Sequence, residues 1–168
     1  EVFRTPHHTP DEQVPSYTLT LEQRQAFLGL QQAYQEQKGS TALLYGITGS
    51  GKTLVFLELI RSVLQENKGV IVMVPEIALT PQMIGRFRSS FGDQVAVFHS
   101  ALSDGERLDE WKRVSRGLAR VVVGTRSAVF APLQHIGLIL LDEEQESSYK
   151  SEQSPRYHAR EVAQFRFA

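Results

Sequence analysis

Eight residues constrain this chain more than any other stretch: Gly46-Ile47-Thr48-Gly49-Ser50-Gly51-Lys52-Thr53. They fit the pattern G-x-x-x-x-G-K-[S/T], in which glycines let the backbone curl so that successive N–H groups point at phosphate oxygens. An apolar run over residues 41–45 precedes them and predicts a buried strand, and residues 54–60 predict a helix after them. Strand, loop and helix in this order predict a phosphate-binding loop; the alternative is a glycine-rich turn that matches by chance.

The chemistry of this loop assigns a role to its last two residues. The N-terminus of the following helix contributes partial positive charge, which favours an anion. Lys52 is expected to reach the β- and γ-phosphates of ATP, and the Thr53 hydroxyl to hold Mg²⁺. All eight residues from Gly46 to Thr53 are therefore predicted to contact the nucleotide.

The composition limits what the rest of the chain can be. A length of 168 residues with 41% hydrophobic and 22% charged residues indicates one soluble globular domain. The net charge of −1 provides no overall basic field, so any nucleic-acid contact must be a local patch. The absence of cysteine excludes disulfides and thiolate zinc sites in this chain and fits a reducing cytoplasm. No apolar run approaches the about 20 residues of a membrane span.

The pattern along the chain divides it into a linker and a domain. Residues 1–17 contain three prolines and read as an extended linker from an upstream domain, and His7-His8 read as a solvated pair rather than metal ligands. A chain that begins at Glu1 and stops within a helical-looking segment, residues 159–168, is expected to be an excised domain.

Helices and apolar strands alternate through residues 18–168. Helices are predicted over residues 18–38 with Thr20 as cap, 80–91 with Pro81 in the first turn, and 103–115 with Ser103 as cap and Leu108, Trp111 and Val114 facing inward. Strands are predicted over residues 69–74, 95–98, 120–123 and 138–141. This alternation predicts a three-layer α/β P-loop NTPase domain, with a mainly parallel sheet and helices on both faces.

A second catalytic element follows the last predicted strand. Asp142 and Glu143 stand at the end of an apolar run over residues 137–141. Beside a phosphate-binding loop this is the Walker B pattern, in which Asp142 holds Mg²⁺ and Glu143 polarises the attacking water. A nucleotide kinase has no evident need of such a glutamate, whereas a hydrolytic motor has. The alternative is an acidic loop that caps a strand.

These blocks together resemble a known family. The phosphate loop, the segment Val74-Pro75-Glu76-Ile77-Ala78-Leu79-Thr80-Pro81-Gln82, the segment 124–132 that begins Gly124-Thr125-Arg126-Ser127, and the acids at 142–144 occur in the order of superfamily 2 helicases. In detail, with Ser147-Ser148-Tyr149-Lys150 and the segment 155–160, they resemble the replication-restart DNA helicases. The resemblance covers nearly all of residues 18–165 and implies the first RecA-like ATPase lobe, truncated before the second lobe.

The resemblance implies further site residues. Gln23 would read the adenine, unless it is an ordinary surface residue of a helix. Four residues would grip the backbone of single-stranded DNA: Thr80, Thr125, Arg126 and Ser127. Tyr149 and Tyr157 would stack on bases, with Lys150 and Arg156 on phosphates. Without the resemblance, Arg126 would read as a solvated loop residue, and the tyrosines as packing on the domain.

Departures from the family pattern reduce what this chain alone is expected to do. Gln145 stands where the family usually has histidine, and a Gln side chain lacks the charge switch of an imidazole. A Ser-Ala-Thr motif, a second lobe with its arginine finger and the family's zinc-binding cysteines are absent from the sequence. The chain alone is therefore expected to be a monomer that binds ATP modestly, hydrolyses it poorly and unwinds nothing.

The resemblance also implies the setting of the longer parent protein. Its cofactors would be ATP and Mg²⁺, with zinc held outside this chain. Its partners would be single-stranded and forked DNA, primosome proteins and single-strand-binding proteins, in the cytoplasm at the bacterial nucleoid, with no membrane. Two alternatives remain: a DNA translocase or remodelling subunit without strand separation, and a nucleotide-gated interaction module.

Overall fold

The computed structural model describes residues 17–36, 41–47, 49–152 and 154–167. The predicted linker up to residue 16, with His7-His8, and Thr48 of the phosphate loop lie outside these residues. The helices are α1 (Leu21–Gln35), α2 (Lys52–Gln65), α3 (Pro81–Phe91), α4 (Asp104–Ser115) and α5 (Ala159–Phe167). The strands are β1 (Gly69–Met73), β2 (Val95–Phe98), β3 (Val121–Gly124), β4 (Ile136–Leu141), β5 (Lys150–Ser151) and β6 (Tyr157–His158). Short 3₁₀ helices, η1 to η4, are Glu76–Ala78, Gly92–Gln94, Arg126–Phe130 and Ser147–Tyr149.

Four strands form a parallel sheet in the order β2-β3-β1-β4. The predicted apolar runs supply it, because a strand covered on both faces needs apolar side chains on both sides. Every residue of β1, β2 and β3 is buried. The strands predicted over 69–74, 95–98, 120–123 and 138–141 are thus confirmed to within two residues.

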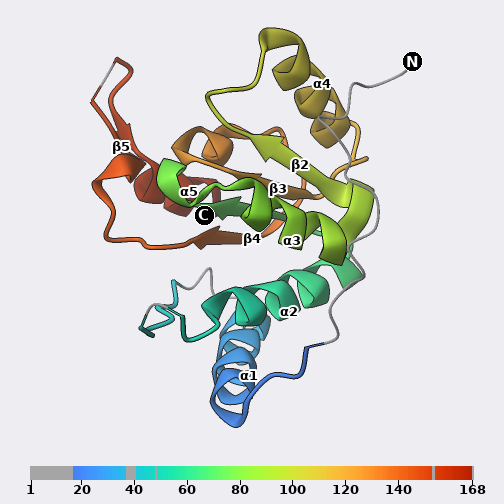
Figure 1. Cartoon of the computed structure of the whole chain (residues 1–168), viewed down its shortest axis with the longest axis vertical. Coiled ribbons are helices and arrows are strands. Elements are labelled where there is room, and N and C mark those ends of the chain that lie inside the picture. Colours follow the sequence, from blue (N-terminus) through green and yellow to red (C-terminus); the bar gives the residue numbers. More distant parts are fainter. Residues whose placement is uncertain (1–16, 37–40, 48, 153, 168) are drawn as a thin grey trace.

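Helices cover both faces of this sheet (Figure 1). On one face α2 and α3 pack on the β-branched side chains of the strands, with Phe56, Ile60 and Phe87 among the buried residues. On the other face α4, α5 and η3 enclose a second cluster that includes Met73, Val129 and Tyr149. This arrangement confirms the predicted three-layer α/β fold. None of the described helices is long and apolar enough to cross a membrane.

Side-chain caps begin three of the helices; the sequence predicts the caps Thr20 and Ser103, whereas it predicts Thr80 only as the start of its helix. The hydroxyls of Thr20, Thr80 and Ser103 each accept a hydrogen bond from a first-turn N–H, and Thr20 and Ser103 form full capping boxes with Gln23 and Glu106. The prediction for the inner face of α4 is only partly right. Val114 is buried, but the side chains of Leu108 and Trp111 are 52% and 44% exposed.

The reason lies in the outer edge of β2, which α4 closes with charged side chains. The N–H of Val97 donates to Glu110 over 2.6 Å, and Arg113 donates both to Glu110 and to the carbonyl of Val95. These side chains satisfy backbone groups that a further strand would otherwise pair. The face of α4 that contacts the sheet therefore carries the Glu110–Arg113 ion pair beside Val114, in place of the apolar stripe that the sequence predicts.

The strand predicted over residues 41–45 is wrong. Residues 41–47 form no strand, and Leu43 and Tyr45 are 80% and 91% exposed. A β-prone run becomes a strand only when its backbone groups find a partner strand. Among the described residues no backbone hydrogen bond joins this segment to β4, the outermost strand on that side.

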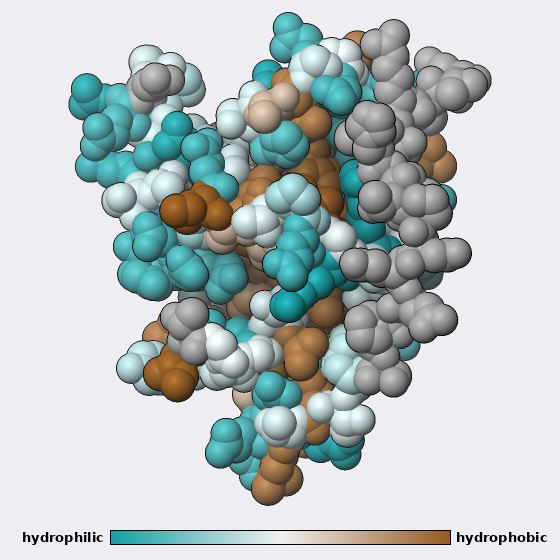
Figure 2. Space-filling view, viewed as in Figure 1, coloured by the Kyte–Doolittle hydropathy of each residue, from teal (hydrophilic) through white to brown (hydrophobic). Residues whose placement is uncertain are grey.

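Two features at the ends of the chain lie outside the three layers. Helix α1 packs on α2 rather than on the sheet, at the bottom of Figure 1. The short antiparallel strands β5 and β6 form a hairpin that projects from the sheet's carboxyl edge. In Figure 2 hydrophilic side chains cover the projecting segment at upper left, whereas apolar side chains gather in the middle of this face.

Candidate nucleotide-binding site and adjoining loops

The predicted phosphate loop leads directly into α2. Gly51 is the N-cap of this helix with φ +79°, and no side chain caps the helix end. The first-turn N–H groups therefore keep the capacity to bind an anion. Gly49 also has a positive φ, of +83°. Both positions favour glycine because an L side chain is strained in this region.

Lys52 folds back over the loop that precedes it. Its ammonium group donates to the carbonyl of Gly46 over 2.7 Å and to that of Ile47 over 3.2 Å. A Cβ on Gly46 would lie 2.8 Å from the Ser50 hydroxyl, so a larger residue there would require the Ser50 side chain to move. The cation thus lies at the loop that the motif assigns to phosphates.

Gln23 connects α1 to the phosphate loop. Its side-chain carbonyl accepts from the N–H of Thr20, and its amide nitrogen donates to the carbonyl of Ser50 over 3.0 Å. A Cβ added to Gly51 would overlap this amide nitrogen. Adenine reading by Gln23 stays a prediction, and the side chain lies next to the loop from which a bound nucleotide would extend.

The acidic turn starts where β4 ends beside β1. The N–H of Asp142 donates to the carbonyl of Met73 over 2.9 Å. Glu143 then adopts a positive φ of +49°, and its N–H donates to the Asp142 carboxylate over 3.0 Å. A left-handed non-glycine residue costs about 1–2 kcal/mol, so such backbones concentrate at functional sites. Glu144 forms an ion pair with Arg160 at the start of α5, and Gln145 is exposed.

The phosphate loop and the acidic turn lie at the same edge of the molecule in Figure 1, which is the carboxyl edge of the parallel sheet. Ligands of such folds bind at this edge. Among the described residues no hydrogen bond links Lys52 or Thr53 to Asp142. The donor set nevertheless fits a magnesium nucleotide: an uncapped helix end and Lys52 for phosphates, and a hydroxyl and a carboxylate for Mg²⁺.

The predicted contacts for a DNA backbone differ in how accessible they are. The Thr80 hydroxyl accepts from the N–H of Met83, and Thr125 is buried. Arg126 is partly buried and donates to the carbonyls of Ser148 and Lys150. Ser127 is exposed. A small pocket of about 70 Å³ lies between these segments, lined by Val74, Glu76, Thr125, Arg126 and Ser148.

The two predicted base-stacking tyrosines have different environments. Tyr149 is 0% exposed, so its ring has no free face for a base, and the prediction that it stacks on DNA is wrong. The apolar cluster under η3 and α5 takes up this ring instead. Tyr157 is partly buried and packs edge-on against Phe130, with ring centroids 5.0 Å apart. Lys150 and Arg156 are exposed, as a phosphate contact requires.

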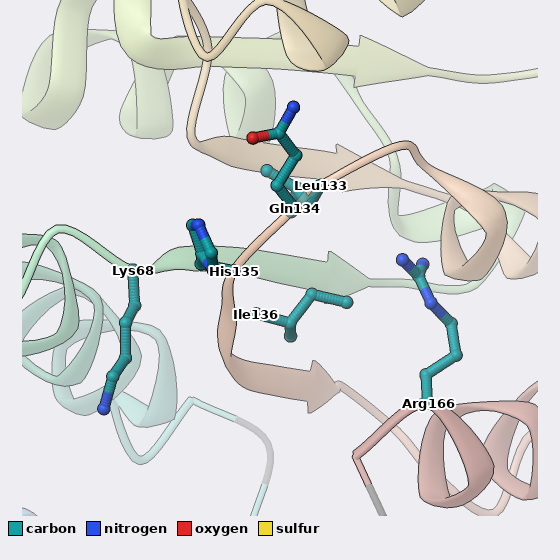
Figure 3. A pocket seen from close by; sticks show the side chains of 6 residues that line it. All are labelled: Lys68, Leu133, Gln134, His135, Ile136 and Arg166. Carbon is teal, nitrogen blue, oxygen red and sulfur yellow. The ribbon is translucent and has the colours of Figure 1, made fainter.

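A pocket of greater volume than the one beside Arg126 lies away from these residues. It has a volume of about 410 Å³ and is lined by Lys68, Leu133, Gln134, His135, Ile136 and Arg166. Figure 3 shows that Lys68 and Arg166 point away from each other. Lys68 is paired with Glu66, and Arg166 donates to the carbonyls of Val129 and Ala131. The hollow therefore offers no convergent group for a ligand, and it lies where β1 and β4 begin.

Comparison with known proteins identifies the family. The family model for the DEAD/DEAH box helicases matches residues 21–166, which is most of the chain. The chain belongs to the DEAD/DEAH box helicase family. This match includes the phosphate loop and the acidic turn, and it runs from the start of α1 into the last turn of α5.

Within the DEAD/DEAH box helicases the chain is similar to replication restart proteins. It is 51% identical to the replication restart protein PriA of Bacillus subtilis over 164 residues, which are 97% of this chain and 20% of that protein. It is 54% identical to PriA of Synechocystis over 125 residues, which are 74% of this chain and 15% of that protein. PriA of Haemophilus influenzae is 46% identical over 145 residues, which are 86% and 20% of the two chains. These matches confirm the resemblance inferred from the sequence.

The chain spans 15–20% of the length of these curated relatives. Two structural features of this DEAD/DEAH box domain were not predicted from its sequence. These are the buried hydroxyl of Tyr149 and the link between Arg126 and the loop around it. The burial of Tyr149 agrees with the alternative that the sequence leaves open for the tyrosines, namely that they pack on the domain.

Proposed function

We propose that this chain is the first ATPase lobe of a replication-restart DNA helicase, here called the full-length parent. The parent hydrolyses ATP to translocate 3′ to 5′ on single-stranded DNA and unwinds duplex at stalled replication forks. The observation that carries this proposal is the pairing of a phosphate loop with an acidic turn at one edge of a parallel sheet, in a DEAD/DEAH box domain.

The residues of the site would divide the work of hydrolysis. The loop from Gly46 to Thr53 and the N-terminus of α2 bind the phosphates, and Lys52 neutralises charge on the β- and γ-phosphates. Thr53 and Asp142 would hold Mg²⁺, which would supply charge stabilisation to the phosphate oxygens. Glu143 orients a water molecule for attack and takes its proton.

ATP and DNA would bind to neighbouring loops of this lobe. Gln23 would bond the adenine edge, for which its amide offers one donor and one acceptor. Thr80, Thr125, Arg126 and Ser127 would contact DNA phosphates, with Lys150 and Arg156 beside them and Tyr157 on a base. In this structure the guanidinium of Arg126 is held by two carbonyls, so a DNA phosphate must share or replace those bonds.

The isolated lobe would bind nucleotide and turn it over slowly. An arginine finger from a second lobe is worth about 10³–10⁵ in rate, and this chain contributes a single lobe. The parent would act at the nucleoid with primosome and single-strand-binding proteins, and any zinc would be held by other parts of it.

Strand displacement by the full-length parent tests this proposal. The substrates are two partial duplexes of the same sequence, one with a 3′ and one with a 5′ single-stranded tail. In each, the protein binds the tail and moves along the strand that carries it. ATP-dependent release from the 3′-tailed duplex alone is expected. Release from the 5′-tailed duplex alone would reverse the direction. ATP hydrolysis without release from either would indicate a translocase that does not separate strands. ATP binding with an ATPase rate that DNA does not stimulate would indicate a nucleotide-gated interaction module.

A further inference from the structure

The hydroxyl of Tyr149 lies under the acidic turn. It contacts the carbonyl oxygen of Asp142 at 2.5 Å and that of Met73 at 2.9 Å. The ring is completely buried between β1, η3 and α5. A buried phenol in van der Waals contact on all sides has few alternative rotamers, so its hydroxyl is a fixed donor.

The carbonyl of Asp142 belongs to the same peptide plane as the N–H of Glu143. Tyr149 binds one end of this plane, and the Asp142 carboxylate accepts from the other end over 3.0 Å. The orientation of the plane sets ψ of Asp142 and φ of Glu143, and this φ is the unusual +49°. A peptide held at both ends keeps that left-handed geometry despite its cost.

The backbone on either side of Tyr149 is held as well. Arg126 donates to the carbonyl of Ser148 over 3.3 Å and to that of Lys150 over 3.1 Å. Burial of the ring and these two bonds to the neighbouring backbone together fix the place of the Tyr149 hydroxyl under the acidic turn.

We infer that Tyr149 is a positioning residue for the ATPase site: its hydroxyl fixes the Asp142–Glu143 peptide plane and so aims both carboxylates. The inference rests on the proposed function for the roles of Asp142 and Glu143. The contact it describes is independent of that function. Loss of the hydroxyl would let the plane rotate, which would misplace the metal-binding carboxylate and the water-activating one together.

The test compares Tyr149→Phe with wild type in the full-length parent. Tyr34→Phe is the matched control, because it also removes a hydroxyl bond, to Glu66, on α1 away from the acidic turn. For Tyr149→Phe we expect kcat for ATP to fall at least tenfold, KM to stay within twofold, and the Mg²⁺ concentration for half-maximal rate to rise severalfold. Tyr34→Phe is expected to change none of these quantities. An unchanged kcat and Mg²⁺ midpoint in Tyr149→Phe would overturn the inference. A fall in kcat with an equal fall in the fraction of protein that binds nucleotide would also overturn it, because the remaining sites would then turn over at the wild-type rate.

Amide hydrogen exchange separates this inference from the proposed function. Peptides that cover residues 142–146 are expected to exchange at least threefold faster in Tyr149→Phe than in wild type or Tyr34→Phe. Unchanged exchange would overturn the inference whatever the ATPase rate. A wild-type parent without ATPase activity would refute the proposed function, and the exchange rates would still decide whether Tyr149 holds the turn.

Discussion

The backbone N–H of Val97, on the outer edge of β2, donates to the buried carboxylate of Glu110 over 2.6 Å. Arg113 completes the arrangement by pairing with that carboxylate at 2.5 Å and donating to the carbonyl of Val95. Helix α4 therefore ends the sheet on this side with side chains in place of a neighbouring strand. Parallel edges are liable to pair with other chains, and this ion pair blocks the pairing.

Glu110→Ala is expected to destabilise the fold strongly. The change leaves the guanidinium of Arg113 and the N–H of Val97 buried without their partner, which costs about 3–5 kcal/mol in the free energy of unfolding. Urea unfolding of the chain measures this loss. Asp104→Ala is the control, because Asp104 pairs with Arg107 on the same helix with the same spacing but in solvent. A similar loss in the two variants would show that burial of the Glu110 pair is unimportant.

Gly51→Ala is expected to weaken nucleotide binding. Alanine at φ +79° costs about 1–2 kcal/mol, and its Cβ would overlap the Gln23 amide that bonds to Ser50. We expect at least tenfold weaker binding in a titration with a fluorescent ATP analogue. Gly85→Ala in α3 meets open space, so it should bind normally and gain about 0.5–1 kcal/mol of stability. Wild-type affinity in Gly51→Ala would contradict the assigned loop geometry.

Much of this fold follows from patterns that local physics fixes. Continuous apolar runs such as 95–98 favour buried strands, and a Ser or Thr just before an amphipathic run, as at Thr80 and Ser103, favours a helix cap. The phosphate loop has the same local character, since the glycines at 49 and 51 take the positive φ that their positions need. The sheet order and the packing on both faces agree with the expected class.

The parts that the sequence did not predict depend on partners distant in the chain. Residues 41–45 have the composition of a strand, but a strand forms only beside a partner strand. No described strand pairs with these residues. Trp111 looked like a core residue until Glu110 proved to be the group facing the sheet. Tyr149 looked like a surface aromatic because its partners, Met73 and Asp142, lie on two different strand ends. Contacts of this kind leave no local sequence pattern.

Lys52→Ala is expected to abolish nucleotide binding while leaving the chain folded. Its ammonium bonds only to carbonyls of its own loop, Gly46 and Ile47, among the contacts the structure describes, so its loss removes phosphate charge neutralisation without opening the core. Equilibrium binding of labelled ATP measures the effect. Lys68→Ala, which removes an equal charge beyond the other end of α2, should bind as wild type does. Retained affinity in Lys52→Ala would exclude the assigned phosphate site.

Arg126→Ala is expected to weaken the binding of single-stranded DNA to the full-length parent. If Arg126 contacts one phosphate, its removal should lower the slope of log K against log salt by about 0.7. Binding of a labelled oligonucleotide at several salt concentrations gives this slope. Arg61→Ala, from the body of α2 where Arg61 pairs with Glu58, serves as the charge-matched control. An unchanged slope in Arg126→Ala would show that Arg126 does not bind a DNA phosphate and bonds only to the carbonyls of Ser148 and Lys150.

The central proposal is that Glu143 activates the water for ATP hydrolysis in a parent protein whose ATPase responds to DNA. It is tested most directly by titrating single-stranded DNA against the ATPase rate of the full-length parent, in wild type and in Glu143→Gln. The account predicts a wild-type rate that rises with DNA to saturation. It also predicts a Glu143→Gln protein that binds ATP normally and stays without turnover at every DNA concentration. A wild-type rate that ignores DNA, or normal turnover by Glu143→Gln, would contradict it.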